Sequence, residues 1–178
     1  KGISRLAGMP KTPAGAIAFV SAISSIACWL NWGFGLIVGA ILAKEVARKL
    51  RGVDYRLLIA SAYSGFVVWH SGISGSVPLS MATAGDALTK ATNGIVTAPI
   101  ALSETIFSIY NIGIALAVIV ALVIVNALMH PKGDEVFCVD PSLLEENCTE
   151  CTKTALTPAQ KTEGSRVLTW IISLLGLS

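Results

Sequence analysis

The stretch Ala27–Ala40 reads ACWLNWGFGLIVGA and decides how the first third of the sequence folds. Its centre, Asn31-Trp32-Gly33-Phe34-Gly35, interrupts a run that has no charged residue from Thr12 to Ala43. Glycine weakens a helix interior, and asparagine favours turns and caps. The stretch therefore indicates that this uncharged run is two half-length helices joined by a turn.

The length of the run supports that interpretation. As one helix, residues 14–43 would be about 45 Å long at about 1.5 Å per residue, whereas a hydrocarbon core is about 30 Å thick. Tilt would absorb only part of the excess. Because Lys and Arg favour the cytoplasmic side of short loops, basic residues at both ends favour a hairpin that enters and leaves from the cytoplasm. We predict a re-entrant helical hairpin over residues 14–43, with Asn31 near mid-membrane. The flanking basic residues are Lys1, Arg5 and Lys11 before the run, and Lys44, Arg48, Lys49, Arg51 and Arg56 after it.

Composition places the whole chain in the membrane class. Of its 178 residues, 53% are hydrophobic and 13% are charged, and its mean hydropathy is +0.70. A soluble domain has about 25% charged residues. Uncharged runs cover residues 12–43, 57–85 and 105–129, and each exceeds the roughly 18 residues of a candidate span. We predict an all-α integral membrane fold.

The second uncharged run contains another break. A helix over LLIASAYSGFVVWH, residues 57–70, would be about 21 Å long, which is short of a full crossing. The next residues, SGISGSVP at 71–78, weaken a helix through their glycines and proline and supply hydroxyls to the freed backbone groups. We predict a broken helix over residues 57–90.

The third run is interrupted only by Asn111 and Asn126, and it predicts a continuous spanning helix over residues 105–129. Residues 1–129 then form a membrane domain. We expect residues 130–166 to be a polar cytoplasmic loop. Residues 167–178 are apolar but too short to span, which predicts the start of a truncated transmembrane helix.

Several function classes are disfavoured. The net charge of +2, without basic residues interleaved with aromatics, gives no indication of nucleic acid as a partner. A nucleophilic enzyme needs a base and an orienting group, but His70 is the single histidine of the uncharged runs, which contain no carboxylate. Cys148-x-x-Cys151 has no second ligand pair, so neither a metal nor another cofactor is expected.

Two broken helices predict one shared cavity. Unpaired peptide groups cost several kcal/mol in hydrocarbon, so such breaks persist only inside protein or beside water. Exposed helix ends bind anions or cations, as in secondary transporters with discontinuous helices. We expect substrate or ion binding by Asn31, Trp32, Gly33, Phe34 and Gly35 at the first break and by His70, Ser74, Gly75 and Ser76 at the second.

The alternatives are structural. Asn31 could only cap a helix, and the glycines could only allow close helix packing. His70 could carry a proton or meet a carboxylate, or it could simply be hydrogen-bonded at a helix end. A structural membrane module without a substrate is therefore the rival from another class.

The order and spacing of several stretches resemble the bacterial short-chain fatty acid transporter family, and the resemblance covers nearly the whole chain. This chain departs from the family pattern at Trp69-His70-Ser71, where the family has glycines, so substrate size or coupling could differ and the role of His70 stays open. The matching stretches are LNWGFGLIVGAILAKEVARKL (30–50), GVDYRLLIASAYSGF (52–66), ISGSVPL (73–79), SETIFSIYNI (103–112) and VDPSLLEE (139–146).

The resemblance implies a secondary active transporter of short-chain carboxylates, such as butyrate or acetoacetate, in the bacterial inner membrane. Its superfamily is built of two inverted repeats, so this chain would be most of the first repeat plus the central loop. The lipid bilayer and the remaining second repeat are then its partners, and a homodimer is left open. We expect Na⁺ or H⁺ as the coupling ion and no transport by this fragment alone.

Within that class, the resemblance places the family's inferred site on Asn31, Gly33, Gly35 and Ser74–Ser76. Helix amides and serine hydroxyls would hold the carboxylate, and Trp32 and Phe34 would line a pocket for its tail. A carrier of another small anion, such as a dicarboxylate, is the alternative within the class.

Overall fold

Two long antiparallel helices meet at Asn31. In the computed structural model, which describes residues 2–83 and 85–144, these helices are α2 (Pro13–Leu30) and α3 (Trp32–Lys49). Asn31 has extended backbone angles, and its side-chain oxygen accepts a hydrogen bond from the Phe34 amide at 3.0 Å. This is the N-cap interaction that ends one helix and starts the next.

The break is shorter, and the helices longer, than the sequence suggested. Trp32–Gly35 form the first turn of α3 rather than a loop, because the Asn31 side chain satisfies a free amide of that turn. Helix α3 also continues past Ala43 to Lys49. Each helix is therefore about 27 Å long, not half a membrane thickness.

Glycines set the register between α2 and α3. A Cβ at Gly39 would lie 2.7 Å from Ser24 Oγ, and a Cβ at Gly35 would overlap the backbone of Cys28. The helix backbones therefore touch at these two pairs, as small residues permit in membrane helices. The same register places the charged end of α3, residues 44–49, beside the first turns of α2.

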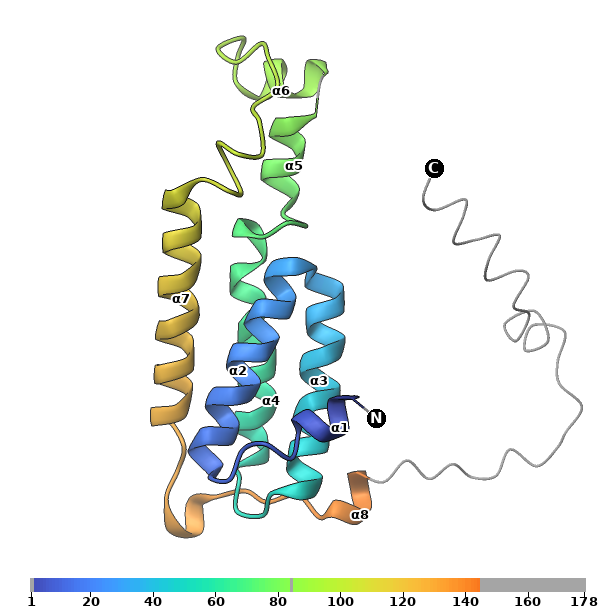
Figure 1. Ribbon diagram of the computed structural model, residues 1–178, viewed down its shortest axis with the longest axis vertical. Helices are drawn as coiled ribbons and strands as arrows, with labels where there is room; N and C mark the ends of the chain where they lie inside the picture. Colours follow the sequence, from blue (N-terminus) through green and yellow to red (C-terminus); the bar gives the residue numbers. More distant parts are fainter. Residues whose placement is uncertain (1, 84, 145–178) are drawn as a thin grey trace, which may run out of the picture. The chain divides into compact units, whose positions relative to one another are not determined.

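The second uncharged run folds into a series of short helices placed end to end, which we call the column. Helix α4 (Tyr55–Ser64) continues as the 3-10 helix η1 (Gly65–Ser71), and α5 (Ser76–Ala82) follows a non-helical break at residues 72–75. Serine side chains satisfy carbonyls along it: Ser64 Oγ donates to Ser61 O at 2.9 Å and Ser71 Oγ to Val68 O at 2.8 Å. The column extends past the end at which α2 and α3 meet and leads to α6 (Asp86–Ala91) (Figure 1).

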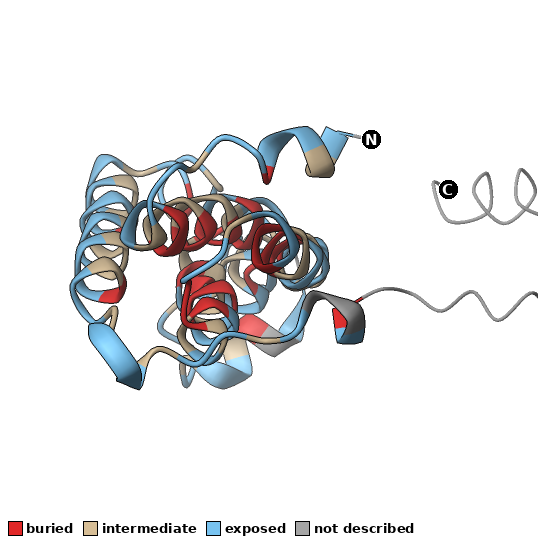
Figure 2. Ribbon diagram, turned by 90° about the horizontal axis from the view of Figure 1, so that it is seen from below, coloured by how far each residue is buried: buried red, intermediate tan, exposed pale blue. Residues whose placement is uncertain are grey.

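Helix α2 is central to the packing. It contacts α3 on one side and α4 with η1 on another, and Figure 2 shows that buried residues gather where these helices meet. Gly65 allows the second contact, since a Cβ there would lie 2.6 Å from the Ser25 backbone nitrogen. Large side chains with less than 2% exposure include Ile17, Val20, Leu42, Val46 and Leu58.

Helix α7 (Ile109–Leu128) packs along α2 with most of its surface exposed; only Ala115 and Asn126 are buried. By length and composition, Pro13–Leu30, Tyr55–Ala82 and Ile109–Leu128 are each able to cross a membrane. The described residues contain no strand. The predicted all-α membrane fold is thus confirmed, and an exposed apolar α7 suits contact with lipid or with further protein.

Basic residues gather at one end of the helices. The start of α2, the end of α3, the start of α4 and the end of α7 lie at this end, together with α1 (Gly2–Leu6) (Figure 1). After α7 the chain forms η2 (Gly133–Glu135) and α8 (Pro141–Leu144). The predictions for residues 145–166, the truncated helix 167–178 and the Cys148–Cys151 pair lie outside the described residues.

Candidate functional site

The two helix breaks lie against each other. The Trp32 amide, the first of α3, donates to Ser74 Oγ at 3.1 Å, and the Ile73 amide donates to the Trp29 carbonyl at 2.9 Å. Gly72 touches the same carbonyl so closely that a Cβ would overlap it. We call this meeting of residues 29–34 with residues 69–76 the break junction.

Aromatic rings cover one side of the break junction. Ring centroids are 5.1 Å apart for Phe66 and Trp69, 5.9 Å for Trp32 and Trp69, and 6.2 Å for Trp32 and Phe66. Trp69 Nε1 donates to the Ser74 carbonyl at 2.9 Å, which fixes the second break. The exposed His70 ring lies 4.3 Å from the Trp69 ring.

The predicted site residues differ in how far they are exposed. Asn31, Trp32, Phe34, His70 and Ser76 are exposed, and Gly33 and Ser74 are half-buried. The other two are buried by backbone contacts. Gly35 packs on Cys28, and a Cβ at Gly75 would lie 2.7 Å from the His70 carbonyl oxygen. These two glycines therefore hold the breaks in shape.

Two hydrogen-bond donors that lie beside the start of α3 are free among the described residues. Ser74 Oγ accepts from the Trp32 amide, which leaves its own hydrogen to donate. The Gly33 amide, in the first turn of α3, has no partner in that part of the chain. Both lie at a helix N-terminus, where the helix dipole favours negative charge. The arrangement suits a small anion.

Asn111 connects the break junction to α7. Its Nδ2 donates to the carbonyls of Ser71 and Ile106, each at 2.8 Å. The sequence marked Asn111 only as a polar residue in an apolar run. Its partner is 40 positions away in the chain, so only the fold could assign it.

A second polar cluster joins α2, α4 and α7. Asn126 Nδ2 donates to Ser21 Oγ at 2.8 Å and to Ser64 Oγ at 2.9 Å, and Ser24 Oγ donates to the Ala62 carbonyl. Ser61 Oγ is buried there without a partner in the described part of the chain. The serines of α2 recur at helical spacing, which is the signal that could have indicated this contact.

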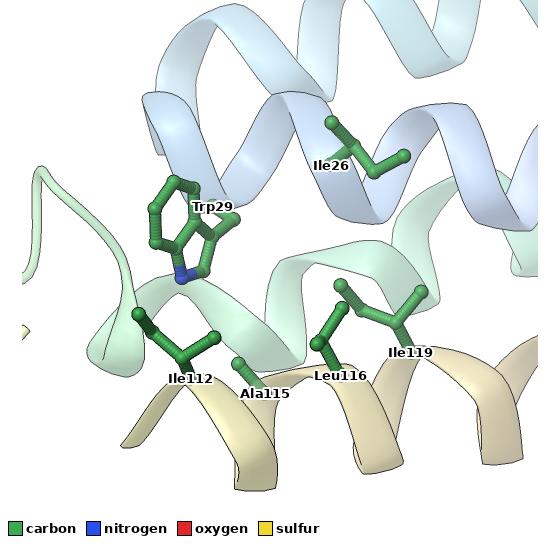
Figure 3. A pocket seen from close by; sticks show the side chains of 6 residues that line it. All are labelled: Ile26, Trp29, Ile112, Ala115, Leu116 and Ile119. Carbon is green, nitrogen blue, oxygen red and sulfur yellow. The ribbon is translucent and has the colours of Figure 1, made fainter. Parts of the chain in front are cut away.

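An apolar cavity of about 240 Å³ lies between α2 and α7. Figure 3 shows the Trp29 side chain beside Ile112 on one side of it. The Trp29 carbonyl belongs to the break junction, so the cavity and the junction are neighbours. The lining residues are Ile26, Trp29, Ile112, Ala115, Leu116 and Ile119.

Because Ser21 of α2 contacts Asn126 of α7, the two residues lie at the same height, and the distances that the two helices extend from this point can be compared. From that contact, α2 rises about 15 Å to Asn31, at about 1.5 Å per residue, whereas α7 rises about 26 Å to Ile109. The two helices run side by side (Figure 1). The hairpin tip therefore stops about 10 Å short of the start of α7.

No cluster of three His, Cys, Asp or Glu side chains suited to a metal occurs in residues 2–83 and 85–144. Cys28 and Cys138 are free thiols there, the first buried and the second exposed. The candidate site thus consists of neutral donors, aromatic rings and helix ends.

Comparison with known proteins decides the family. The family described as "Short chain fatty acid transporter" matches residues 1–178. The chain belongs to the short-chain fatty acid transporter family. Two curated relatives carry the name "Putative short-chain fatty acid transporter". That of Escherichia coli K12 is 42% identical over 175 residues, which cover 97% of this chain and 38% of the relative. That of Haemophilus influenzae is 43% identical over 187 residues, which cover 100% of this chain and 41% of the relative.

The chain spans about two fifths of the length of these members of the short-chain fatty acid transporter family. No solved structure matches it. Membership confirms the resemblance seen in the sequence, and the long apolar helices agree with a membrane protein.

Proposed function

We propose that this chain is part of a secondary active transporter of short-chain carboxylates, with the carboxylate bound at the break junction. The observation that carries the proposal is the contact between the Trp32 amide and Ser74 Oγ, 3.1 Å apart. It joins two helix breaks and leaves the Ser74 hydroxyl and the Gly33 amide as donors. A carboxylate accepts such hydrogen bonds, and bonds to a charged group are worth about 1.5–3 kcal/mol.

The aliphatic tail needs an apolar wall beside these donors. Trp32 and Trp69 supply one, since both are hydrogen-bonded to Ser74, and the Phe66 ring contacts the rings of both. A dicarboxylate would need a second set of donors or cations, and the neighbouring walls are aromatic. A monocarboxylate is therefore the better fit to the surroundings, and a dicarboxylate stays the alternative.

The depth of the hairpin supports a re-entrant placement. The uncharged part of α7 is about as long as the hydrocarbon core is thick. If α7 spans, the tip at Asn31 ends about 10 Å before the far surface, so that the hairpin returns to the basic end. Lys and Arg beside membrane helices usually lie on the cytoplasmic side. This placement therefore puts the basic end in the cytoplasm and the protein in the bacterial inner membrane.

We expect the rest of the protein to complete the site. The Ser74 hydroxyl and the Gly33 amide would form one side of it, and the second inverted repeat would form the opposite side. Na⁺ or H⁺ would couple transport, and exposed His70 is a candidate for the proton. The rival function is a structural membrane module, for which mutation of these donors would change no uptake.

The first test is uptake of labelled butyrate into vesicles that contain the full-length protein, under imposed Na⁺ or H⁺ gradients. Ser74→Ala removes one carboxylate donor, so we expect at least a tenfold loss of butyrate affinity, equivalent to about 1.4 kcal/mol. Ser80→Ala is the matched control because Ser80 is exposed on α5 and lies outside the break junction. No uptake of any short carboxylate under either gradient, or equal affinities in the two variants, would defeat the proposal.

The second test is protection of engineered cysteines by substrate. Single cysteines at Asn31, Trp32 and Phe34 are suitable because these side chains are exposed, whereas Gly35 has no room for one. The background has Cys138, Cys148 and Cys151 replaced by serine and keeps buried Cys28.

Butyrate at saturating concentration should slow labelling at these positions by an aqueous thiol reagent severalfold. A cysteine at Ile95, which is 86% exposed and distant in sequence from both breaks, should be labelled at the same rate with and without butyrate. Equal protection at both places, or uniform inaccessibility of the tip, would count against a substrate site.

A further inference from the structure

A cavity of about 830 Å³ lies at the basic end of the helices, between α1 and α3. Residues 2–5 of α1 form one wall, and Ile41, Glu45 and Arg48 of α3 form the other. Lys49 holds the two walls together because its ammonium donates to the Ser4 carbonyl and, at 2.8 Å, to Ser4 Oγ. The cavity is therefore a feature of how α1 is fixed on α3. It is far along α3 from the break junction.

The charges around this cavity favour a small anion. Arg5 is exposed and has no ion-pair partner among the described residues. Arg48 Nη1 donates to Glu45 Oε1 at 3.0 Å, which leaves the other guanidinium hydrogens available. Two guanidinium groups and one carboxylate leave a net positive charge. Guanidinium matches the geometry of phosphate oxygens and binds them through paired hydrogen bonds.

An apolar stripe on α3 leads away from the cavity. Phe34, Ile37 and Ile41 are 57%, 62% and 44% exposed, and their spacing places them on one face of the helix. Glu45 and Arg48 continue the same face toward the basic end. The face thus changes from exposed hydrocarbon to cations along about 20 Å of helix, which is the polarity profile of a phospholipid from acyl chain to headgroup.

We propose that the cavity between α1 and α3 binds the phosphodiester headgroup of an anionic phospholipid. One acyl chain lies along Ile41 and Ile37, and the phosphate contacts Arg5 and Arg48. Basic pockets at the cytoplasmic ends of membrane helices recognise anionic headgroups in this way. Free phosphate shares the chemistry of the headgroup but has no acyl chain to contact the apolar stripe. Binding of phospholipid and binding of free phosphate can therefore be distinguished by experiment.

The experiment measures thermal unfolding of the purified full-length protein in detergent with added lipid. Phosphatidylglycerol should raise the unfolding midpoint by several degrees, because a ligand bound only to the folded state stabilises it. Phosphatidylcholine with the same acyl chains and inorganic phosphate should each produce less than half of that shift. Arg5→Gln with Arg48→Gln should remove most of the shift, and Lys90→Gln on α6 should keep it.

Native mass spectrometry of the wild-type protein, with both lipids present, provides a readout that does not depend on the variants folding. It should show phosphatidylglycerol adducts in excess over phosphatidylcholine adducts. Equal adducts and equal thermal shifts for the two lipids would overturn the proposal. A shift reproduced by inorganic phosphate would assign the cavity to a free anion instead, and a full shift in the double arginine variant would place the lipid elsewhere.

Discussion

Gly65→Ala should lower the free energy of unfolding by about 3 kcal/mol, as expected for overpacking a close backbone contact. A Cβ at Gly65 would lie 2.6 Å from the Ser25 nitrogen and 2.7 Å from the Ser24 carbonyl carbon. Both are backbone atoms of the central helix α2, so neither can move aside like the end of a flexible side chain. The added Cβ fits only if η1 moves away from α2. Because η1 leads directly into the break junction, this movement would also separate the two helix breaks.

The matched control is Gly113→Ala on α7, where a Cβ would meet nothing within 4 Å. Alanine is a better helix former than glycine by about 1 kcal/mol, so this variant should be as stable as the wild type or more stable. Thermal unfolding of the full-length protein in detergent, followed by circular dichroism, measures both variants. Equal stability of the two would mean that α2 and η1 are not held in contact as described.

Asp54→Ala should cost about 2 kcal/mol of stability at neutral pH. Asp54 is 2% exposed and caps α4, with Oδ1 accepting from the Leu57 amide at 2.9 Å. Its Oδ2 accepts from the Phe137 amide at 2.8 Å and from Arg56 Nη2 at 3.0 Å. One carboxylate thus ties the start of α4 to the segment after α7. Because the Arg56 side chain is 65% exposed, that ion pair contributes little, and Arg56→Gln should be milder.

The effect of Asp54 should depend on pH in a defined direction. Burial alone would raise the pKa of its carboxyl, but the hydrogen bonds from Phe137, Leu57 and Arg56 outweigh burial and lower the pKa to about 2 from its usual 3.8. A lowered pKa in the folded state means that the stabilisation is present above about pH 4 and is lost as the pH falls through about 2. The shift corresponds to about 2 kcal/mol.

The measurement is the difference in unfolding midpoint between wild type and Asp54→Asn across pH 7 to pH 2.5. The difference should be constant near neutrality and should shrink below about pH 4, because protonation of the wild-type carboxyl reproduces the uncharged variant. Asp86→Asn, at an exposed position in α6, should shift the midpoint little at any pH. A wild-type advantage that persists unchanged to pH 2.5 would contradict the assigned role.

Local properties of the chain predicted much of this architecture. Uncharged runs longer than a membrane span predicted helices, since backbone groups in hydrocarbon must be paired within their own segment. Asn31 and Gly72–Gly75 marked both helix breaks, because asparagine caps and glycine weakens helices irrespective of distant partners. The exact extent of the first break was not predictable in this way, because Trp32 and Phe34 suit either a turn or a helix until a cap is assigned.

What the sequence determined by itself is the membrane class, the helical content and the position of each break, because these depend on hydropathy and on residues close together in the chain. Only the tertiary structure decided that the Trp32 amide meets Ser74, that Asn111 and Asn126 attach α7, and that Gly35 and Gly65 are contact points. Those pairings join residues far apart in sequence. They depend on helix register and on free space around each backbone, which no local pattern encodes.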